Sequence, residues 1–108
     1  MIDIEEINDN VKVQDLFEIY SSMLTAKQRD VMDLYYFSDL SLREIAQNKK
    51  ITYQAVRDSI KTAEKLLNDC ESKLLINKKN KKIEKAIAVL AKEESAAVKK
   101  AVKILESL

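Results

Sequence analysis

Neither glycine nor proline occurs anywhere in the 108 residues of this chain. These two residues form most tight turns and interrupt helices, so their absence leaves a sequence dominated by helix formers such as Leu, Ala, Lys, Glu and Gln. A chain of this length can bury one hydrophobic core but not two. We therefore expect an all-α fold in a single domain.

The same composition argues against an enzyme. Without glycine there is no phosphate-cradling loop, and the chain has no histidine, which is the usual general base and the commonest metal ligand. No nucleophile and base pair and no metal cluster can be assembled from the remaining residues. We expect a protein that is not an enzyme and needs no cofactor.

Cysteine content and hydropathy indicate the cellular compartment of the protein. Cys70 is the only cysteine, so it cannot form an internal disulfide, and a reducing compartment suits it. No apolar run approaches the ~20 residues that span a bilayer, and no basic segment leads into an apolar run near the N-terminus. We expect a cytoplasmic protein that does not insert into membranes.

Charge is unevenly distributed along the chain, although the formal net charge is only +1. Residues 1–41 contain nine acids and three bases, residues 42–76 seven bases and five acids, and residues 77–108 nine bases and four acids. A non-specific DNA binder normally has a stronger basic footprint, because phosphate neutralisation supplies most of its affinity. The pattern indicates a bipolar molecule, whose acidic end could meet its own basic end or a basic partner.

Residues 41–60 predict two helices joined by a tight turn. Ser41 and Glu44 form a capping box, in which the two side chains satisfy two backbone amides at the start of a helix. Thr52 can cap a second helix, and the interval 49–51 is as short as a helix-turn-helix requires. The residues expected to face inward are Leu42, Ile45, Ala46, Ile51, Ala55, Val56 and Ile60. Such helix pairs also occur in all-α proteins that bind no nucleic acid, so this geometry does not by itself identify a ligand.

Two amphipathic helices are predicted before this motif. After a loose or partly helical lead-in, apolar residues recur at helical spacing over residues 11–24. Thr25 and Gln28 form a second capping box, which begins a helix that runs through Phe37. The expected apolar positions are Val13, Leu16, Phe17, Ile19, Tyr20, Met23, Leu24, Val31, Met32, Leu34 and Tyr35.

The second helix of the motif is predicted to continue well beyond it, from Tyr53 to about Leu75. An apolar seam with alternating steps of four and three runs through Val56, Ile60, Ala63, Leu67, Cys70 and Leu74. At ~1.5 Å per residue this helix would be roughly 35 Å long, too long for the helix-turn-helix alone to cover. Either the C-terminal third folds back along it, or a second subunit covers it, or both, and we expect a homodimer.

Residues 77–82, NKKNKK, contain four lysines. The run indicates a solvated hinge or, alternatively, a patch that contacts the phosphates of RNA or DNA. Two apolar stripes follow, and Ser95 can cap the second, which predicts two short helices, with one continuous helix as the alternative. We therefore divide the single domain, residues 1–108, into a helix-turn-helix core at 11–76 and a C-terminal helical extension at 77–108.

Four segments, taken in order, resemble known proteins. They are Leu24–Arg29 (LTAKQR), Leu34–Tyr36 (LYY), Ser41–Ala46 (SLREIA) and Gln54–Arg57 (QAVR). Together they resemble region 4 of bacterial sigma factors and, more closely, the YlxM family of small helix-turn-helix proteins of Gram-positive bacteria and their wall-less relatives. The resemblance implies a sigma-region-4-like DNA-binding fold, a regulatory role, and a link to the signal recognition particle pathway.

In this resemblance residues 42–48 form the supporting helix and Tyr53 begins the recognition helix. Lys49 stands where region 4 proteins usually have a core hydrophobe. Lys50 stands where many have glycine in a left-handed backbone conformation, which costs any other residue about a kcal/mol. Tyr53 replaces an arginine, so one phosphate or base contact is expected to be missing.

The face that this arrangement would present to the major groove consists of Arg43, Thr52, Tyr53, Gln54, Arg57 and Lys61. Arg57 is the best candidate for a base or phosphate contact, because its planar fork can bind guanine through two hydrogen bonds. Gln54 could read adenine, and Arg43 and Lys61 would touch backbone phosphates. Asp58 disfavours close approach of phosphate and could instead mark a surface for protein contact.

Two functions from different classes fit these patterns. The first is a non-enzymatic helix-turn-helix regulatory protein that binds DNA, or alternatively RNA. The second keeps the sigma-like shape but docks on a protein or ribonucleoprotein, such as a signal recognition particle component. The weak net basicity, Lys49, Tyr53 and Asp58 favour the second, whereas the intact motif framework favours the first.

Overall fold

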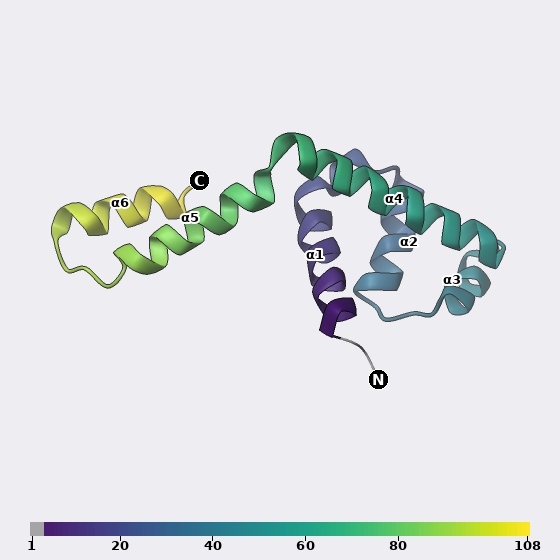
Figure 1. Ribbon diagram of the computed structural model, residues 1–108. Coiled ribbons are helices and arrows are strands. Elements are labelled where there is room, and N and C mark those ends of the chain that lie inside the picture. Colours follow the sequence, from purple (N-terminus) through teal and green to yellow (C-terminus); the bar gives the residue numbers. More distant parts are fainter. Residues whose placement is uncertain (1–3) are drawn as a thin grey trace. The chain divides into compact units, whose positions relative to one another are not determined.

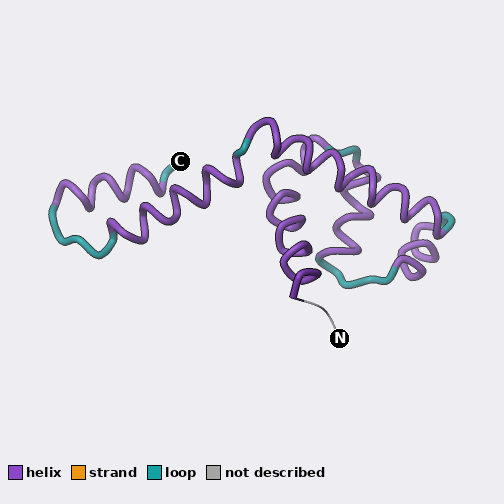
Figure 2. Tube along the Cα trace, viewed as in Figure 1, coloured by secondary structure: helices purple, strands orange, loops and turns teal. Residues whose placement is uncertain are grey.

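The computed structural model describes the backbone of residues 4–108 and the side chains from Asn10 onward. The described residues form six α-helices and one short 3-10 helix and contain no strand (Figures 1 and 2). The α-helices are α1 Ile4–Tyr20, α2 Ala26–Tyr36, α3 Leu42–Lys49, α4 Tyr53–Leu74, α5 Ile76–Leu90 and α6 Ala96–Glu106. This confirms the all-α fold predicted from the absence of glycine and proline.

The described chain divides into two compact units, one ending at Leu74 and the other spanning Leu75–Leu108. In the first unit α4 contacts each of α1, α2 and α3 (Figure 1). Every fully buried apolar side chain among the described residues belongs to this unit, and together they form its core. They are Leu16, Tyr20, Leu24, Val31, Met32, Ile45, Val56, Ile60, Ala63 and Leu67.

The helices α1 to α3 cover the apolar seam of α4 at Val56, Ile60, Ala63 and Leu67, which are at most 5% exposed. The expectation that this part of the seam needed the C-terminal third or a second subunit was wrong, because it left out α1 and α2. The cover ends before Leu74, whose side chain is 51% exposed.

The first helix begins earlier than predicted. It starts at Ile4 rather than at residue 11 and ends at Tyr20, after which Ser21–Met23 form the 3-10 helix. A 3-10 helix has three residues per turn, so it rotates the following side chains off the face that the α-helix set. Met23, predicted to face inward, is 61% exposed as a result.

Three residues that are not glycine have a left-handed backbone: Asp39, Lys50 and Leu75, with φ of 55°, 56° and 54°. Lys50 ends α3, as predicted. Its amide donates to the carbonyl of Gln47 (3.4 Å), and the amide of Ile51 donates to the carbonyl of Ala46 (3.1 Å). This is the pattern of hydrogen bonds that normally closes a helix on glycine. A chain without glycine must place other residues at such positions, at a steric cost.

The substitution Lys50→Gly is expected to raise the free energy of unfolding by about 0.5 to 1 kcal/mol, because glycine removes the steric cost of φ 56° but loses more entropy on folding. Chemical denaturation followed by circular dichroism measures this change. Lys65→Gly is the matched control, since Lys65 is an exposed residue inside α4. There glycine should destabilise by about 1 kcal/mol. A loss of stability in both variants would contradict the prediction.

The second unit is a hairpin in which α5 and α6 contact each other. Two helices are present, and the hydroxyl of Ser95 caps α6 by accepting from the amide of Val98 (3.1 Å), as predicted. The predicted hinge at residues 77–82 was wrong, because these residues lie inside α5. Lysine is a good helix former, and the helix break instead falls at Leu75.

Candidate nucleic-acid interface

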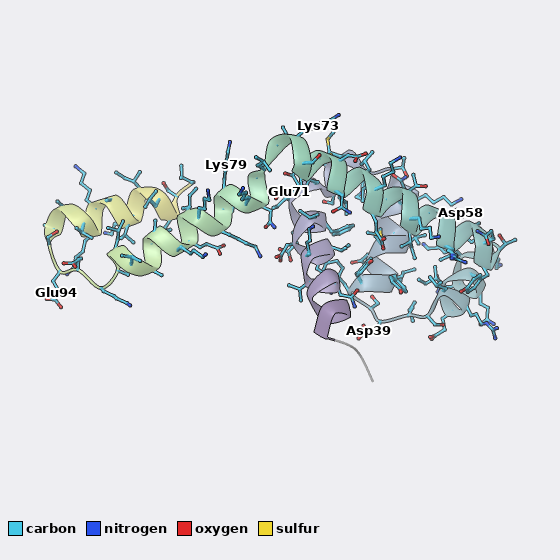
Figure 3. The ribbon with its side chains drawn as sticks, in the orientation of Figure 1. Asp39, Asp58, Glu71, Lys73, Lys79 and Glu94 are labelled. Atoms are coloured by element: carbon cyan, nitrogen blue, oxygen red, sulfur yellow. The ribbon has the colours of Figure 1, made fainter. Side chains whose placement is uncertain are left out.

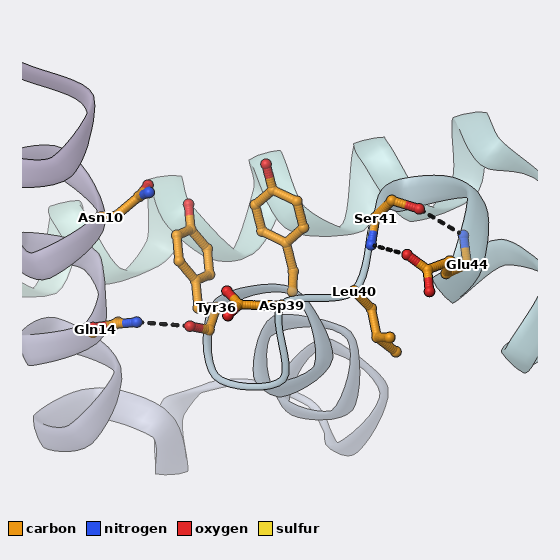
Figure 4. Close-up of a pocket in the computed structure, with 8 residues that line it drawn as sticks. Asn10, Gln14, Tyr36, Asp39, Leu40, Ser41 and Glu44 are labelled. Carbon is orange, nitrogen blue, oxygen red and sulfur yellow. Dashed lines mark hydrogen bonds between the residues drawn. The ribbon is translucent and has the colours of Figure 1, made fainter. Parts of the chain in front are cut away.

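The capping box at Ser41 begins α3 as predicted. The hydroxyl of Ser41 accepts from the amide of Glu44, and the Glu44 carboxylate accepts from the amide of Ser41, each at 3.1 Å (Figure 4). Ile45 is fully buried on the inner face of α3, with Leu42 and Ala46 partly buried beside it. This helix is therefore anchored in the core as the supporting helix of a helix-turn-helix must be.

The corner between α3 and α4 consists of three residues, Lys50, Ile51 and Thr52. The side chain of Ile51 packs against the core, and the Thr52 hydroxyl accepts from the amide of Ala55 at 3.0 Å. Thr52, predicted as part of the DNA-facing surface, thus also caps the recognition helix. The order of supporting helix, short corner and recognition helix matches the predicted motif.

Lys49 stands where region 4 proteins usually have a core hydrophobe, and its side chain pairs with a residue of α2. Its ammonium lies 2.6 Å from a carboxylate oxygen of Asp30, and the two side chains are 32% and 66% exposed. An exposed ion pair of this kind contributes about 0 to 1 kcal/mol, less than a buried apolar side chain would. The pairing nevertheless engages Lys49 with α2, away from the residues predicted to face DNA.

Two hydroxyl to carboxylate hydrogen bonds hold α4 against the helices beneath it. Tyr20 of α1 donates to Glu71 at 2.7 Å, and Tyr36 of α2 donates to Glu64. Both tyrosines also contribute to the core through their rings. These contacts fix the direction of α4 along its length, so its exposed side chains have a defined orientation.

All six residues predicted for the DNA-facing surface are exposed: Arg43, Thr52, Tyr53, Gln54, Arg57 and Lys61. Arg57 and Lys61 are one turn apart on α4, and Lys65, also exposed, continues the same row. Lys65 is not among the six predicted residues, although its four-residue spacing from Lys61 is evident in the sequence. We call Arg57, Lys61 and Lys65 the basic row of α4.

The start of α3 lies beside this row. Leu42 lines a shallow hollow of about 170 Å³ together with Arg57 and Lys61. Arg43 is the residue next to Leu42 and is exposed. The structure therefore brings the beginning of the supporting helix next to the side of the recognition helix that carries the cations.

Gln54 already has a partner within its own helix. Its amide nitrogen donates to the Asp58 carboxylate at 2.8 Å (Figure 3, in which Asp58 is labelled). Their spacing of four residues, one turn of the helix, is the local signal in the sequence for this hydrogen bond. Contact of this amide with adenine requires that the bond to Asp58 be exchanged for one to the base.

Replacing Asp58 with asparagine is expected to strengthen binding to duplex DNA by about threefold to tenfold, because it removes one negative charge beside the basic row. Fluorescence anisotropy at low salt measures the change. Asp33→Asn, at an exposed position on α2, removes the same charge elsewhere and should have a smaller effect. Equal gains in the two variants would mean that only net charge matters.

A second hollow, of about 300 Å³, lies at the loop between α2 and α3 (Figure 4). Its polar groups serve the fold: Gln14 donates to the carbonyl of Tyr36 (2.6 Å), and Ser41 and Glu44 form the capping box. Of the titratable groups that line it, Asp39 and Glu44 are acidic and none is basic. The hollow therefore serves to position the loop and does not provide a phosphate site.

A family model matches residues 7–107 of the chain, and its description is "Putative helix-turn-helix protein, YlxM / p13 like". The chain belongs to this family. The match covers both units, so the C-terminal hairpin is part of the family and not an appendage of this chain. The resemblance to the YlxM family inferred from the four sequence segments is thereby confirmed.

Curated relatives agree with this assignment. A UPF0122 protein of Bacillus pumilus is 42% identical over 95 residues, which cover 86% of each chain. One of Clostridium botulinum is 48% identical over 81 residues, 75% of this chain and 74% of the relative. One of Limosilactobacillus reuteri is 49% identical over 69 residues, 64% of this chain and 61% of the relative. Among the described helices of the YlxM-like chain, none is both long and apolar enough to cross a membrane.

Proposed function

We propose that this YlxM-like protein is a non-enzymatic, cytoplasmic regulator that binds duplex DNA through its helix-turn-helix. The observation that carries the proposal is the exposed face on the first turns of α4, held by a supporting helix and a three-residue corner. A helix presented in this way fits the major groove, where base edges differ between the four base pairs. Family membership in a helix-turn-helix group supports the same function.

Four residues of this surface have a defined contact in the proposal. Arg57 binds a guanine edge or a phosphate, and Lys61 and Arg43 bind phosphates beside it. Gln54 reads adenine after it leaves Asp58. These are the same assignments that the sequence suggested, and Lys65 is added as a further phosphate contact.

The test is fluorescence anisotropy of a labelled mixed-sequence DNA duplex with the full-length protein at two salt concentrations. Binding that weakens steeply with salt is expected, because neutralising phosphates releases counterions. A structured RNA of similar length serves as the competing ligand. Absence of duplex binding at low salt would refute the proposal.

A second function, docking on a protein or ribonucleoprotein of the signal recognition particle pathway, is favoured by a separate observation. The chain up to Leu74 contains fourteen acids and ten bases, which weakens attraction to phosphates. The recognition helix also exposes a large tyrosine, Tyr53, at 46%. Aromatic side chains of this kind are common at protein interfaces.

Substituting Arg57 and Gln54 with alanine distinguishes the two functions, since DNA binding should be lost and binding to the protein or ribonucleoprotein partner should be kept.

We also propose that the protein is a homodimer. In the hairpin Leu75–Leu108 no side chain is fully buried, and Val89 and Ile104 are 66% and 58% exposed. Two helices alone bury too little apolar surface to be stable without further contacts. Sedimentation equilibrium of the full-length protein tests this. A monomer at micromolar concentration would contradict it.

A further inference from the structure

Positive charge is concentrated in the hairpin rather than in the helix-turn-helix. Residues 75–108 contain nine bases and four acids, whereas the chain up to Leu74 has four more acids than bases. Affinity for duplex DNA comes largely from cations that neutralise phosphates. The unit with the recognition helix therefore has a geometry for reading DNA without the charge that normally holds DNA.

The helical structure of residues 77–82 puts lysines on one side of α5. At about 100° per residue, positions separated by three, four and seven share a helix face. The exposed lysines with this spacing, which we call the lysine stripe, are Lys78, Lys81, Lys82 and Lys85. A flexible hinge would not have aligned them.

Most large apolar residues of α5 lie on the opposite side from the lysine stripe, whereas Val89, four residues after Lys85 and 66% exposed, lies on the same side. Ile83, Ile87 and Leu90 are partly buried, and α5 contacts α6. A basic helix that binds a membrane surface inserts its apolar face into lipid. In this hairpin that face is directed to α6, so the geometry favours a phosphate backbone over a bilayer as the ligand of the stripe.

Two members of the stripe, Lys82 and Lys85, form no ion pair with a carboxylate of the described residues. Glu84 is the only acidic residue in the sequence of α5; it follows Lys81 by three residues and is about 100° around the helix from Lys85. The ammonium groups of Lys82 and Lys85 are exposed to solvent.

We propose that the lysine stripe of α5 is a second DNA-binding surface, which holds backbone phosphates of duplex DNA. The inference rests on the proposed DNA-binding function and assigns its electrostatic part to the hairpin. Lysine suits this role because its ammonium is a compact charge that binds phosphate without selecting a base. The stripe supplies affinity, and the recognition helix supplies discrimination between sequences.

The test is a double substitution, Lys82→Gln with Lys85→Gln, in the full-length protein. Glutamine keeps a good helix propensity, and circular dichroism verifies the helix content. Duplex binding is measured by anisotropy over a series of salt concentrations. The slope of log affinity against log salt should become shallower by about 2, since each phosphate contact contributes about 0.9.

The matched control is Lys12→Gln with Lys27→Gln, which removes the same charge from exposed positions on α1 and α2. Its slope should equal that of the wild type. Equal slopes in the wild type and the Lys82 and Lys85 variant would overturn the inference, as would an equal reduction in the control.

Further measurements distinguish failure of this inference from failure of the proposed function. If Arg57→Ala weakens duplex binding while the slope of the Lys82 and Lys85 variant is unchanged, only the inference fails. If the wild type binds no duplex, both fail. If the variant loses binding to a structured RNA or to phosphatidylserine vesicles but keeps the wild-type salt dependence on DNA, the stripe serves that other ligand and the inference is overturned.

Discussion

Alanine at position 45 is expected to lower the free energy of unfolding by about 2 to 5 kcal/mol, the range for removal of a large buried aliphatic side chain. Ile45 has no exposed surface and lies on the inner face of α3. Removal of this side chain leaves a cavity beneath α3. The eight-residue helix cannot shift to close the cavity without disturbing the turn that joins α3 to α4. Urea denaturation followed by circular dichroism measures the change.

Val11→Ala is the matched control for this substitution, because this branched aliphatic side chain on α1 is 50% exposed and lies outside the hairpin that we propose dimerises. Its effect on unfolding should stay within about 1 kcal/mol. Comparable losses in the two variants would mean that α3 is not anchored by Ile45. DNA binding by Ile45→Ala should also weaken in proportion to the fraction unfolded, which distinguishes a lost fold from a lost contact.

The substitution Arg57→Ala is expected to weaken binding to the preferred duplex by about tenfold to a hundredfold, which corresponds to roughly 1 to 3 kcal/mol. Arg57 is exposed on α4 and is the first member of its basic row. Because the side chain is not part of the core, the stability of the fold should change little. Anisotropy titrations against a duplex selected from a random library provide the measurement.

Arg57→Lys keeps the charge and removes the planar fork, so it separates the two possible contacts. Recovery of most of the affinity by lysine would assign Arg57 to a phosphate, and failure to recover would assign it to a guanine edge. Wild-type affinity in Arg57→Ala would show that α4 does not contact the duplex at this position. Lys12→Ala, on the exposed side of α1, controls for the loss of one charge.

Local signals in the sequence were sufficient for the helix-turn-helix. The two capping boxes, at Thr25 and Ser41, are both present in the structure. Such boxes depend only on residues three positions apart, so they require no knowledge of the rest of the fold. The left-handed conformation of Lys50 could also be inferred from the position where the motif normally has glycine.

Other features depend on residues far apart in the chain. The ion pair between Lys49 and Asp30 joins residues nineteen positions apart, and no local pattern connects them. Tyr20 and Glu71 are fifty-one positions apart. The cover of the α4 seam by α1 was missed for the same reason, because periodicity shows which residues are buried without showing what buries them.

Composition and short-range spacing were enough to predict that this chain is helical, where its capped helices begin, and which residues could face a DNA groove. Which helices cover α4 became clear from the packing of the folded chain, and the helical conformation of residues 77–82 aligns the lysines of α5. The apolar spacing of a helix is the same whichever partner buries its apolar face, so it does not identify that partner. A run of lysines and asparagines is compatible with both a hinge and a helix. In this chain the flanking apolar residues of α5 pack against α6, and the run is helical.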